Sequence, residues 1–515
     1  MEKPRLNALL WHNLASQCSG EEKGGKLSTP SQAASGVPGL DEVLSGGFTR
    51  GSLFLIEGQP GTGKTTMALQ FLLEGAQAGE SSLCITLSET KAELLDGAAS
   101  HGWTLGPNIE VFELQPAETV LDPEQQQSLL YSSELELGET VKLIFEIVER
   151  IKPDRIVLDS LSEIRLLAQS SLRYRRQLLA LKHYFARSNA TVLALDDLTT
   201  DVLDKTAHSI AHGVIRLEEL APTYGGERRR MRVMKYRGHA FRGGYHDFII
   251  STDGVEIFPR LVSKEYVGTV SHTVFSSGNN ELDALLGGGA DGGSSTLVLG
   301  PAGCGKSLIV FQFAVAAIRR GERAALFAFD EELGLLFRRT KGMGIDLEGF
   351  RNEGGLLVQQ IDAAELSPGE FSHRVRECVE QNSVGTVIID SLNGYQLAMP
   401  EEKSLILHMH ELLQYLNRRG VATFVTVAQH GLVGDMKTPV DVTYLADTVI
   451  LLRFFEAEGK IRRAISVIKK RTGTHEDTIR ELKITSQGLV VGDALEDYHG
   501  ILRGVPSLPG TSKET

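Results

Sequence analysis

The chain carries the same glycine-rich sequence twice, and this duplication constrains its fold more than any other feature. Residues 58–66 read GQPGTGKTT and residues 300–308 read GPAGCGKSL, so Lys64 and Lys306 are 242 positions apart. The preceding sequences correspond as well, because SGVPGLDEVLSGGFTRG before the first copy matches SGNNELDALLGGGADGG before the second. Internal repeats indicate duplicated structural units, so we expect two domains of the same fold.

Two further sequences recur downstream of each glycine-rich copy, in the same order. The first half contains RIVLDS with Asp159, and the second contains TVIIDS with Asp390. Near the end of each half, VMKYRG matches VIKKRTG. The aspartates are 231 positions apart, which is fewer than the 242 between the lysines. The first half therefore carries an insertion, which we assign to an extra loop at residues 114–139.

Each half alternates short β-rich segments with helical patterns, as an α/β fold does. SLFLIEG and STLVLG are apolar runs that end at glycine, and a helical pattern follows each. This alternation predicts a mainly parallel sheet covered by helices. The later hairpin patterns, HDFIISTDGVEIFP and RELKITSQGLVVG, predict added antiparallel strands. We place the domains at residues 27–262 and 263–496, with mobile tails at residues 1–26 and 497–515.

The composition is that of a globular protein and narrows the classes that the chain can belong to. Hydrophobic residues make up 42% of the 515 residues, and no run reaches the ~18 apolar residues of a membrane span. The N-terminal sequence lacks a signal-peptide core, so we expect a cytoplasmic protein without a membrane partner. The cysteines form no CxxC pair, which argues against a disulfide framework or a zinc site. The formal net charge of −13 disfavours nucleic acid, although ERRRMRVMKYRGHAFRGG is locally basic.

Both glycine-rich sequences match G-x-x-x-x-G-K-[ST], the P-loop that holds nucleotide phosphates. Its glycines let backbone N–H groups wrap around phosphate oxygens at a helix N-terminus, and its lysine reaches the β- and γ-phosphates. A short pattern can match by accident, but a strand before it, a helix after it and a second copy argue against accident here. The predicted ATP-binding residues are Gly58, Gly61, Thr62, Gly63, Lys64, Thr65, Thr66, Gly300, Gly303, Cys304, Gly305, Lys306, Ser307 and Leu308.

An aspartate ends the third predicted strand of each half, where the strand lies beside the loop. Asp159 and Asp390 can hold Mg²⁺ there, together with the hydroxyls of Thr65 and Ser307. The alternative is that each aspartate only caps the helix that follows it.

Acidic residues also end the second predicted strand of each half. Glu89 and Glu331 each lie 25 residues after their loop lysine, and Asp330 precedes Glu331. A carboxylate here can orient the attacking water or take a proton from a hydroxyl. We therefore assign catalytic roles to Glu89, Asp330 and Glu331, together with Lys64 and Lys306. A solvated acidic turn is the alternative.

Polar residues end the fourth predicted strand of each half as well. They are Asp196 and Asp197 in the first half and Gln429 in the second. A polar side chain at this position could sense the γ-phosphate.

Two cationic pairs recur far along the chain from their own loops. Lys235 and Arg237 match Lys469 and Arg471, and His475 follows the second pair. Alternate residues of a strand point to the same side, so each pair projects two cations together. Cations directed at the ATP of a neighbouring subunit would stabilise the transferred phosphoryl group, as an arginine finger does. A charged, solvated strand edge is the alternative.

With these motifs assembled, the chain resembles the KaiC family of two-domain RecA-like ATPases. The resemblance covers about residues 30–500 and includes YLADTVILLRFFE and VIKKRTGTHEDTIRELKITSQG besides the loops and aspartate strands. It implies two tandem RecA-like P-loop NTPase domains in a homohexameric double ring, with ATP between subunits and Lys and Arg supplied by the neighbour. It also implies a slow ATPase in the first domain and self-phosphorylation of an adjacent Ser/Thr pair by the second.

The sequence departs from the family pattern at the second strand. The family has a Glu-Glu pair there, whereas this chain has Ser88-Glu89 in the first half and Asp330-Glu331 in the second. We therefore expect the first site to be the weaker catalyst and the second to carry out phosphoryl transfer.

A second departure concerns the phosphoacceptor pair, which corresponds to Thr443-Tyr444 in this chain. Thr443 is the candidate phosphoacceptor, because Tyr444 offers a phenol of different reach. The alternative is a structural threonine at the start of a strand.

Three functions fit the sequence. The leading hypothesis is an ATP-driven ring with Ser/Thr autokinase activity, acting as a timing or signalling hub for regulatory proteins. The second is a RecA- or helicase-like DNA-dependent motor, suggested by the arginines at positions 228–230. The third is a nucleotide-gated scaffold with little turnover, suggested by Ser88.

Overall fold

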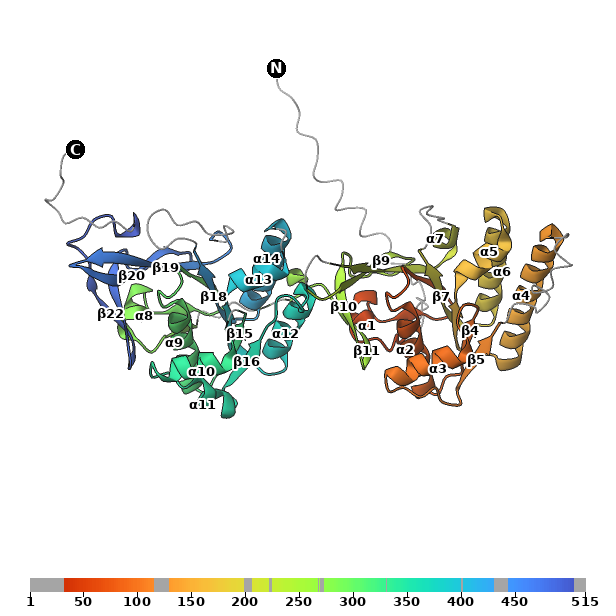
Figure 1. Ribbon diagram of the computed structural model, residues 1–515, viewed down its shortest axis with the longest axis horizontal. Helices are drawn as coiled ribbons and strands as arrows, with labels where there is room; N and C mark the ends of the chain where they lie inside the picture. Colours follow the sequence, from red (N-terminus) through yellow and green to blue (C-terminus); the bar gives the residue numbers. More distant parts are fainter. Residues whose placement is uncertain are drawn as a thin grey trace, which may run out of the picture.

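Two similar α/β units lie side by side along the longest axis of the molecule, one from each half of the chain (Figure 1). The computed structural model describes residues 32–114, 129–198, 206–221, 225–266, 268, 273–329, 331–399, 402–429 and 443–503. The predicted tail at residues 1–26, the end of the predicted tail at residues 497–515 and the candidate catalytic residue Asp330 lie outside the described residues. Within them, no helix is long and apolar enough to cross a membrane.

The first unit is built on one nine-stranded sheet. Its strands are β3 (Leu53–Gly58), β4 (Ser82–Thr86), β5 (Ile109–Glu113), β6 (Arg155–Asp159), β7 (Thr191–Asp197), β8 (Gly213–Leu220), β9 (Arg228–Tyr236), β10 (His246–Ser251) and β11 (Gly254–Phe258). They lie in the order β11-β10-β9-β8-β3-β7-β6-β4-β5. Strands β8 to β5 of that order are parallel, and β9, β10 and β11 are antiparallel.

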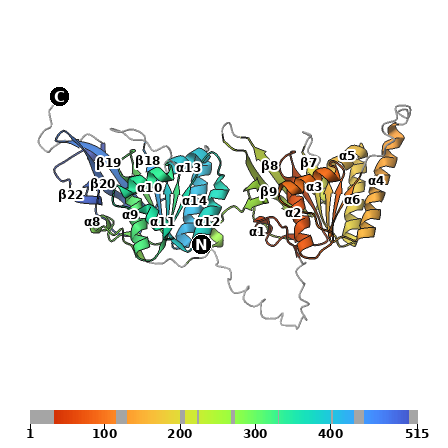
Figure 2. The same ribbon diagram turned by 60° about the horizontal axis from the view of Figure 1, so that its bottom comes forward.

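Helices cover both faces of this sheet. They are α1 (Leu40–Leu44), α2 (Lys64–Gln77), α3 (Lys91–Ser100), α4 (Leu129–Ile151), α5 (Leu161–Ala168), α6 (Ser171–Arg187) and α7 (Thr206–Ile210), and a short strand pair joins β1 (Gln32–Ala33) to β2 (Phe48–Thr49). Figure 2 shows α2 and α3 on one side of the sheet and α4, α5 and α6 on the other. Each side has its own apolar core, because the central strands are buried on both faces.

The second unit repeats this architecture with strands in the order β16-β15-β17-β18-β14-β19-β20-β21-β22. The strands of this sheet are β14 (Ser295–Gly300), β15 (Arg323–Ala328), β16 (Leu356–Gln360), β17 (Val384–Asp390), β18 (Ala422–Ala428), β19 (Thr448–Ala457), β20 (Lys460–Lys470), β21 (Arg480–Thr485) and β22 (Gly488–Ala494). The short strands β12 (Val274–Phe275) and β13 (Ala290–Asp291) form a separate pair, as β1 and β2 do in the first unit. The helices are α8 (Asn280–Leu285), α9 (Lys306–Arg319), α10 (Leu333–Lys341), α11 (Leu347–Asn352), α12 (Pro368–Glu380), α13 (Leu392–Ala398) and α14 (Glu402–Arg418), with 3₁₀ turns η3 (Ser263–Glu265) and η4 (Ile501–Arg503). The predicted α/β class, with tandem mainly parallel sheets and added antiparallel strands, is confirmed.

The insertion of the first half is not simply a loop. Residues 129–139 form the beginning of α4, while residues 115–128 lie outside the described residues. Leu137, Val141, Ile144 and Val148 are buried against the sheet at helical spacing. The prediction of a loop up to residue 139 was therefore wrong, because this apolar stripe continues the helix toward its N-terminus.

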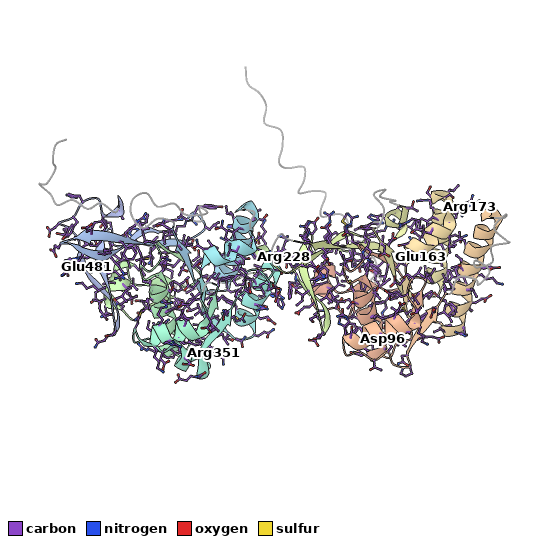
Figure 3. All side chains as sticks on the ribbon, viewed as in Figure 1. Asp96, Glu163, Arg173, Arg228, Arg351 and Glu481 are labelled. Carbon is purple, nitrogen blue, oxygen red and sulfur yellow. The ribbon has the colours of Figure 1, made fainter. Side chains whose placement is uncertain are left out.

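The two units contact each other through the antiparallel edge of the first sheet and α12 of the second unit. The Gly369 amide in the first turn of α12 donates to Asp247 Oδ2 on β10 at 2.7 Å, and burial raises the pKa of Asp247. Arg228 donates to the Ala363 carbonyl at 3.2 Å and lies where the units meet in Figure 3. Arg376 on α12 forms an ion pair with Glu42 at 3.0 Å. Polar contacts thus fix the junction.

Candidate nucleotide-binding sites

The first P-loop connects β3 to α2 and curls around its own lysine. The Lys64 ammonium donates to the carbonyls of Gly58 at 3.0 Å and Gln59 at 2.9 Å. Gly63, just before the helix, has a φ of 89°, and a Cβ there would lie 2.6 Å from Ile250 Cδ1 on β10. The left-handed backbone favours glycine at this position, and a Cβ would also displace the end of the Ile250 side chain. The backbone N–H groups at the start of α2 are left to face phosphate oxygens.

The second P-loop, between β14 and α9, has the same geometry. Lys306 donates to the carbonyls of Gly300 at 3.1 Å and Pro301 at 2.9 Å, and Gly305 has a φ of 109°. Agreement between two independent copies supports a shape built for one kind of ligand.

Not every P-loop side chain can contact a nucleotide. Thr62 and Cys304, which occupy the same position in the two loops, are both buried beneath the loop, and Leu308 is buried in the core. Burial raises the pKa of the Cys304 thiol, which keeps it neutral. These residues are placed to serve ATP through their backbone only. Thr66 lies in the first turn of α2.

The proposed Mg²⁺ pair of the first site is preformed. The Thr65 hydroxyl donates to Asp159 Oδ2 at 3.0 Å, and Asp159 ends β6 in a buried position. Burial, together with the nearby carboxylates of Glu89 and Asp197, raises the pKa of Asp159 to about 6, although the Thr65 hydrogen bond acts in the opposite direction. A bound cation would stabilise a carboxylate in this environment, so the donors fit Mg²⁺.

The corresponding residues of the second site line one pocket of about 360 Å³. Asp390 at the end of β17 also accepts a hydrogen bond from Thr426 on β18. Neither Asp159 nor Asp390 is the N-cap of the following helix, because that position belongs to the serine after each of them. The pocket is lined by Ala302, Gly303, Lys306, Ser307, Phe311, Leu326, Ala328, Glu331, Leu336, Asp390, Ser391 and Ala428.

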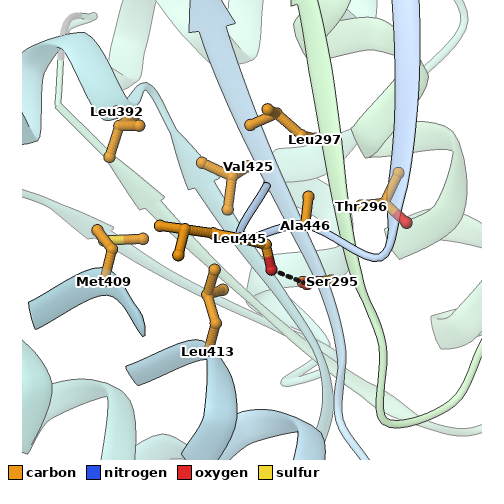
Figure 4. A pocket seen from close by; sticks show the side chains of 9 residues that line it. All are labelled: Ser295, Thr296, Leu297, Leu392, Met409, Leu413, Val425, Leu445 and Ala446. Atoms are coloured by element: carbon orange, nitrogen blue, oxygen red, sulfur yellow. Dashed lines mark hydrogen bonds between the residues drawn. The ribbon is translucent and has the colours of Figure 1, made fainter. Parts of the chain in front are cut away.

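A second hollow in the same unit is too small for a ligand. Its volume is about 10 Å³, and its walls are almost entirely apolar (Figure 4). Leu445 and Ala446 insert there between β14, β18 and α14. This packing anchors the turn that carries Thr443.

The two candidate catalytic glutamates are in different environments. The backbone of Glu89 is fixed by Thr86, whose hydroxyl accepts from the Glu89 amide at 3.1 Å. Among the described residues, no cation forms an ion pair with its carboxylate. Burial raises the pKa of Glu89, and the negative charges of Glu93 and Asp197 raise it further. The neighbouring Ser88 is exposed.

Glu331 is instead held by Arg339 from the following helix. Arg339 Nε lies 3.0 Å from Glu331 Oε1, and Arg339 Nη2 lies 2.6 Å from Glu331 Oε2. The sequence interpretation missed Arg339. The only sequence signal for this ion pair was the Arg338-Arg339 pair in a mostly apolar helix, and the sequence does not indicate which of the two arginines faces Glu331.

The fourth strands differ as well. Asp197 at the end of β7 forms an ion pair with Lys64 at 2.7 Å, whereas Ala428 occupies the same register position on β18. Asp196 points to the other side, where Arg165 pairs with it. Gln429 donates its backbone amide to the Gly300 carbonyl at 3.0 Å.

The KxR cations bind backbone carbonyls of their own chain in both units. Lys235 donates to the carbonyls of His208 at 2.5 Å and Ala211 at 2.7 Å, and Arg237 donates to that of Ser209. Lys469 and Arg471 repeat this, as Lys469 donates to Thr443 at 3.0 Å and Ala446 at 2.7 Å, and Arg471 to Tyr444 at 2.8 Å. The KxR pair therefore fixes an equivalent turn in each unit, a role that the spacing of the motif did not reveal.

The KxR cations and the P-loop of the same unit lie at opposite ends of the strands. In the second unit, Lys469 pairs with Val449 near the start of β19, and β19 runs parallel to β14. The P-loop follows the far end of β14, five residues beyond Ser295, or about 17 Å at ~3.3 Å per residue. His475 lies in the loop after β20, beside Gly287. Neither the KxR pair nor Thr443 is near the P-loop of its own unit.

A model of the KaiC ATPase family matches residues 33–262 and, separately, residues 275–496. The chain belongs to the KaiC family. The circadian clock protein KaiC3 of Synechocystis sp. is 29% identical over 486 residues, which cover 93% of this chain and 95% of that protein. The circadian clock oscillator protein KaiC of Parathermosynechococcus lividus is 29% identical over 487 residues, covering 92% and 87%. The resemblance seen in the sequence is confirmed.

Membership of the KaiC family makes the chain a nucleotide-binding P-loop ATPase, as its two loops predicted. The basic segment that suggested a DNA motor has other partners in this KaiC-family fold. Arg229 pairs with Glu219 at 3.0 Å, Arg230 pairs with Glu218 at 2.8 Å, and Arg228 contacts the second unit. The three arginines that suggested a DNA motor therefore all make contacts within the chain.

Proposed function

We propose that the chain is a Mg²⁺-dependent ATPase that works as a homohexameric double ring, with ATP bound between subunits. One observation carries this proposal: in each unit the P-loop lies at one end of the parallel strands and the KxR pair lies at the opposite end. A KxR pair that cannot reach its own P-loop can contact that of a neighbour in a closed ring.

Each chain would supply the same groups at both sites. The loop backbone with Lys64 or Lys306 binds the phosphates, and Thr65 with Asp159, or Ser307 with Asp390, would hold Mg²⁺. The metal supplies charge neutralisation on the phosphate oxygens. Glu89 or Glu331 then orients the attacking water and accepts its proton, and Asp330 would assist Glu331. The residues that would act on the ATP of the adjacent subunit are Lys235, Arg237, Lys469, Arg471 and His475.

The contacts favour the first site as the main source of basal hydrolysis. Glu89 has a raised pKa and no ion pair among the described residues, which suits a general base. Glu331 is occupied by Arg339. The sequence expectation of a weaker first site depended on Ser88, whose side chain is exposed, so the residue that matters at this site is Glu89.

We further propose Ser/Thr autokinase activity in the second domain, with Thr443 as the phosphoacceptor. Thr443 lies in the turn held by Lys469 and Arg471, the same residues that would contact the neighbour's ATP. The γ-phosphate would then reach Thr443 from the adjacent subunit. Two relatives are named as circadian clock proteins, which supports a timing role. We propose that the chain acts in the cytoplasm as a timing or signalling hub for regulatory proteins.

The decisive test compares ATP hydrolysis in Lys64→Ala, Lys306→Ala and the double variant, with the mass of the assembly measured with and without ATP. We expect each single change to remove one part of the turnover, the double change to abolish it, and ATP to produce a hexamer. Turnover that survives the double change would contradict the two-site ATPase. A persistent monomer would contradict catalysis between subunits.

A further inference from the structure

The ion pair between Glu331 and Arg339 occupies both oxygens of the carboxylate. The guanidinium presents two N–H groups in parallel, at 3.0 Å and 2.6 Å, which is the geometry of a bidentate contact. Glu331 lines the same pocket as Lys306, Ser307 and Asp390. The carboxylate of Glu331, the candidate general base that lines this pocket, is therefore engaged by Arg339.

Arg339 is held in place by the packing of α10. Glu332 caps this helix by accepting from the amides of Gly334 and Leu335, both at 2.8 Å. Leu336 and Phe337 are buried, so the helix is fixed against the sheet and Arg339 faces Glu331. The carboxylate of Glu332 is thus used as the helix cap, whereas the neighbouring Glu331 lines the pocket.

In the part of the chain that the structure describes, the first site has no ion pair of this kind. Helix α3 corresponds to α10, and Gly97 occupies the position of Arg339, both of them eight residues after the glutamate. The helices are otherwise packed alike, because Leu94 is buried as Leu336 is. The cation is therefore a property of the second site and not of the fold.

We propose that Arg339 gates the second nucleotide site by holding Glu331 away from the attacking water until the ion pair opens. This inference rests on the proposed ATPase function. In the reaction, the water oxygen bonds to the γ-phosphorus, the bond from the γ-phosphorus to the bridging oxygen of ADP breaks, and the water proton moves to Glu331. A carboxylate whose two oxygens are held by Arg339 is poorly placed to accept that proton.

The exposure of the pair fits a gate and not a permanent block. The side chains of Glu331 and Arg339 are 26% and 31% exposed, so the pair is partly screened by water. Pairs of this kind contribute little to stability, so an open state is accessible and removal of the cation should raise turnover by only about twofold to fivefold.

The experiment uses the full chain with Glu89→Gln, which mutes the first site. Hydrolysis is then measured at several ATP concentrations after adding Arg339→Ala, Arg339→Lys or the control Arg338→Ala, each with and without Lys306→Ala. Arg338 is the matched control because it lies on the same helix and its removal causes the same change in net charge. Its side chain is exposed. We expect Arg339→Ala to raise kcat about twofold to fivefold with KM unchanged, Arg339→Lys to have an intermediate effect, and Arg338→Ala to have none.

Ionic strength provides a readout that a merely structural role would not change. Salt weakens a partly exposed ion pair, so turnover should rise with moderate salt when Arg339 is present and stay flat in Arg339→Ala. A kcat that is unchanged or lower in Arg339→Ala, while turnover still requires Lys306, would overturn the gate and leave the ATPase proposal standing. Turnover that ignores Lys306→Ala in every variant would overturn both. If Arg339→Ala fails to fold, Arg339→Lys decides by the same criteria.

Discussion

The ammonium of Lys64 lies 2.7 Å from Asp197 Oδ1, so the P-loop lysine of the first site is in an ion pair with a carboxylate. The second site has Ala428 at the corresponding position of its sheet, but there Arg339 holds Glu331, the glutamate that we propose as general base. Each site therefore has one functional group in an ion pair, and it is a different group in each.

The first prediction concerns Asp197→Ala. The triphosphate must displace Asp197 from Lys64, and two anions compete for one cation. We expect the variant to bind ATP about three- to tenfold more tightly, since an ion pair of this exposure contributes about 1 kcal/mol. A fluorescent ATP analogue titrated into the Lys306→Ala background reports the first site alone.

The matched control for this prediction is Asp96→Ala on α3, which removes an exposed carboxylate that lies on the surface in Figure 3. It should leave the affinity unchanged. Weaker binding in Asp197→Ala would show that Asp197 helps to hold the nucleotide and does not compete with it.

The second prediction concerns Thr443. We expect Thr443→Ala to abolish incorporation of label from γ-labelled ATP and to leave hydrolysis intact, whereas Tyr444→Phe should still be labelled. Because Thr443 is far from its own P-loop, transfer should occur between subunits. A mixture of Thr443→Ala chains with Lys306→Ala chains should therefore become labelled, and only on the Lys306→Ala chains. Label that persists in Thr443→Ala alone would exclude this residue.

The third prediction concerns the junction between the units. Asp247→Ala leaves the Gly369 amide at the start of α12 without its acceptor, which should lower the free energy of unfolding by about 1–2 kcal/mol. Asp247→Asn keeps an acceptor and should cost less. Calorimetry measures the loss, and Asp253→Ala, in the exposed turn after β10, is the control. Equal stability of Asp247→Ala and the unmodified chain would show that the contact is not formed in solution.

The fourth prediction concerns pH and His246. Its Nδ1 accepts from the Arg260 amide at 2.8 Å and its Nε2 donates to the Arg242 carbonyl at 2.9 Å, so the buried ring is neutral. Burial lowers the pKa of His246 to about 4, below about 6.5 in the unfolded chain. The unfolded state therefore binds the extra proton first. Stability is fully present above pH ~6.5 and falls as the pH drops toward about 4, by up to ~1.4 kcal/mol per pH unit.

His246→Gln should flatten this part of the curve, although the lost contacts will lower stability at pH 7. Free energies of unfolding at several pH values between 7.5 and 4 provide the measurement. His183→Gln, on the exposed face of α6, should keep the slope of the unmodified chain. The same slope in His246→Gln would assign the acid sensitivity to other groups.

Much of each candidate site could be predicted because its parts are local in sequence. The P-loop is nine consecutive residues, and the aspartate proposed to hold Mg²⁺ ends a recognisable apolar strand. The insertion was assigned less well, because the apolar stripe of α4 begins inside a polar stretch. The sequence did not predict that Lys235 and Lys469 stabilise a turn by donating to its backbone carbonyls, because backbone carbonyls have no sequence signature.

By itself, the sequence determined that this protein is a duplicated α/β ATPase with two P-loops, because glycines, a lysine and strand-end aspartates at fixed spacing allow few other arrangements. Only the tertiary structure decided how the two sites differ. Lys64 and Asp197 are 133 positions apart and meet because β3 and β7 are neighbours in the sheet. Glu331 meets Arg339 because buried residues of α10 turn that face of the helix toward the pocket. Ion pairs form between side chains that folding brings together, and the order of residues along the chain does not specify them.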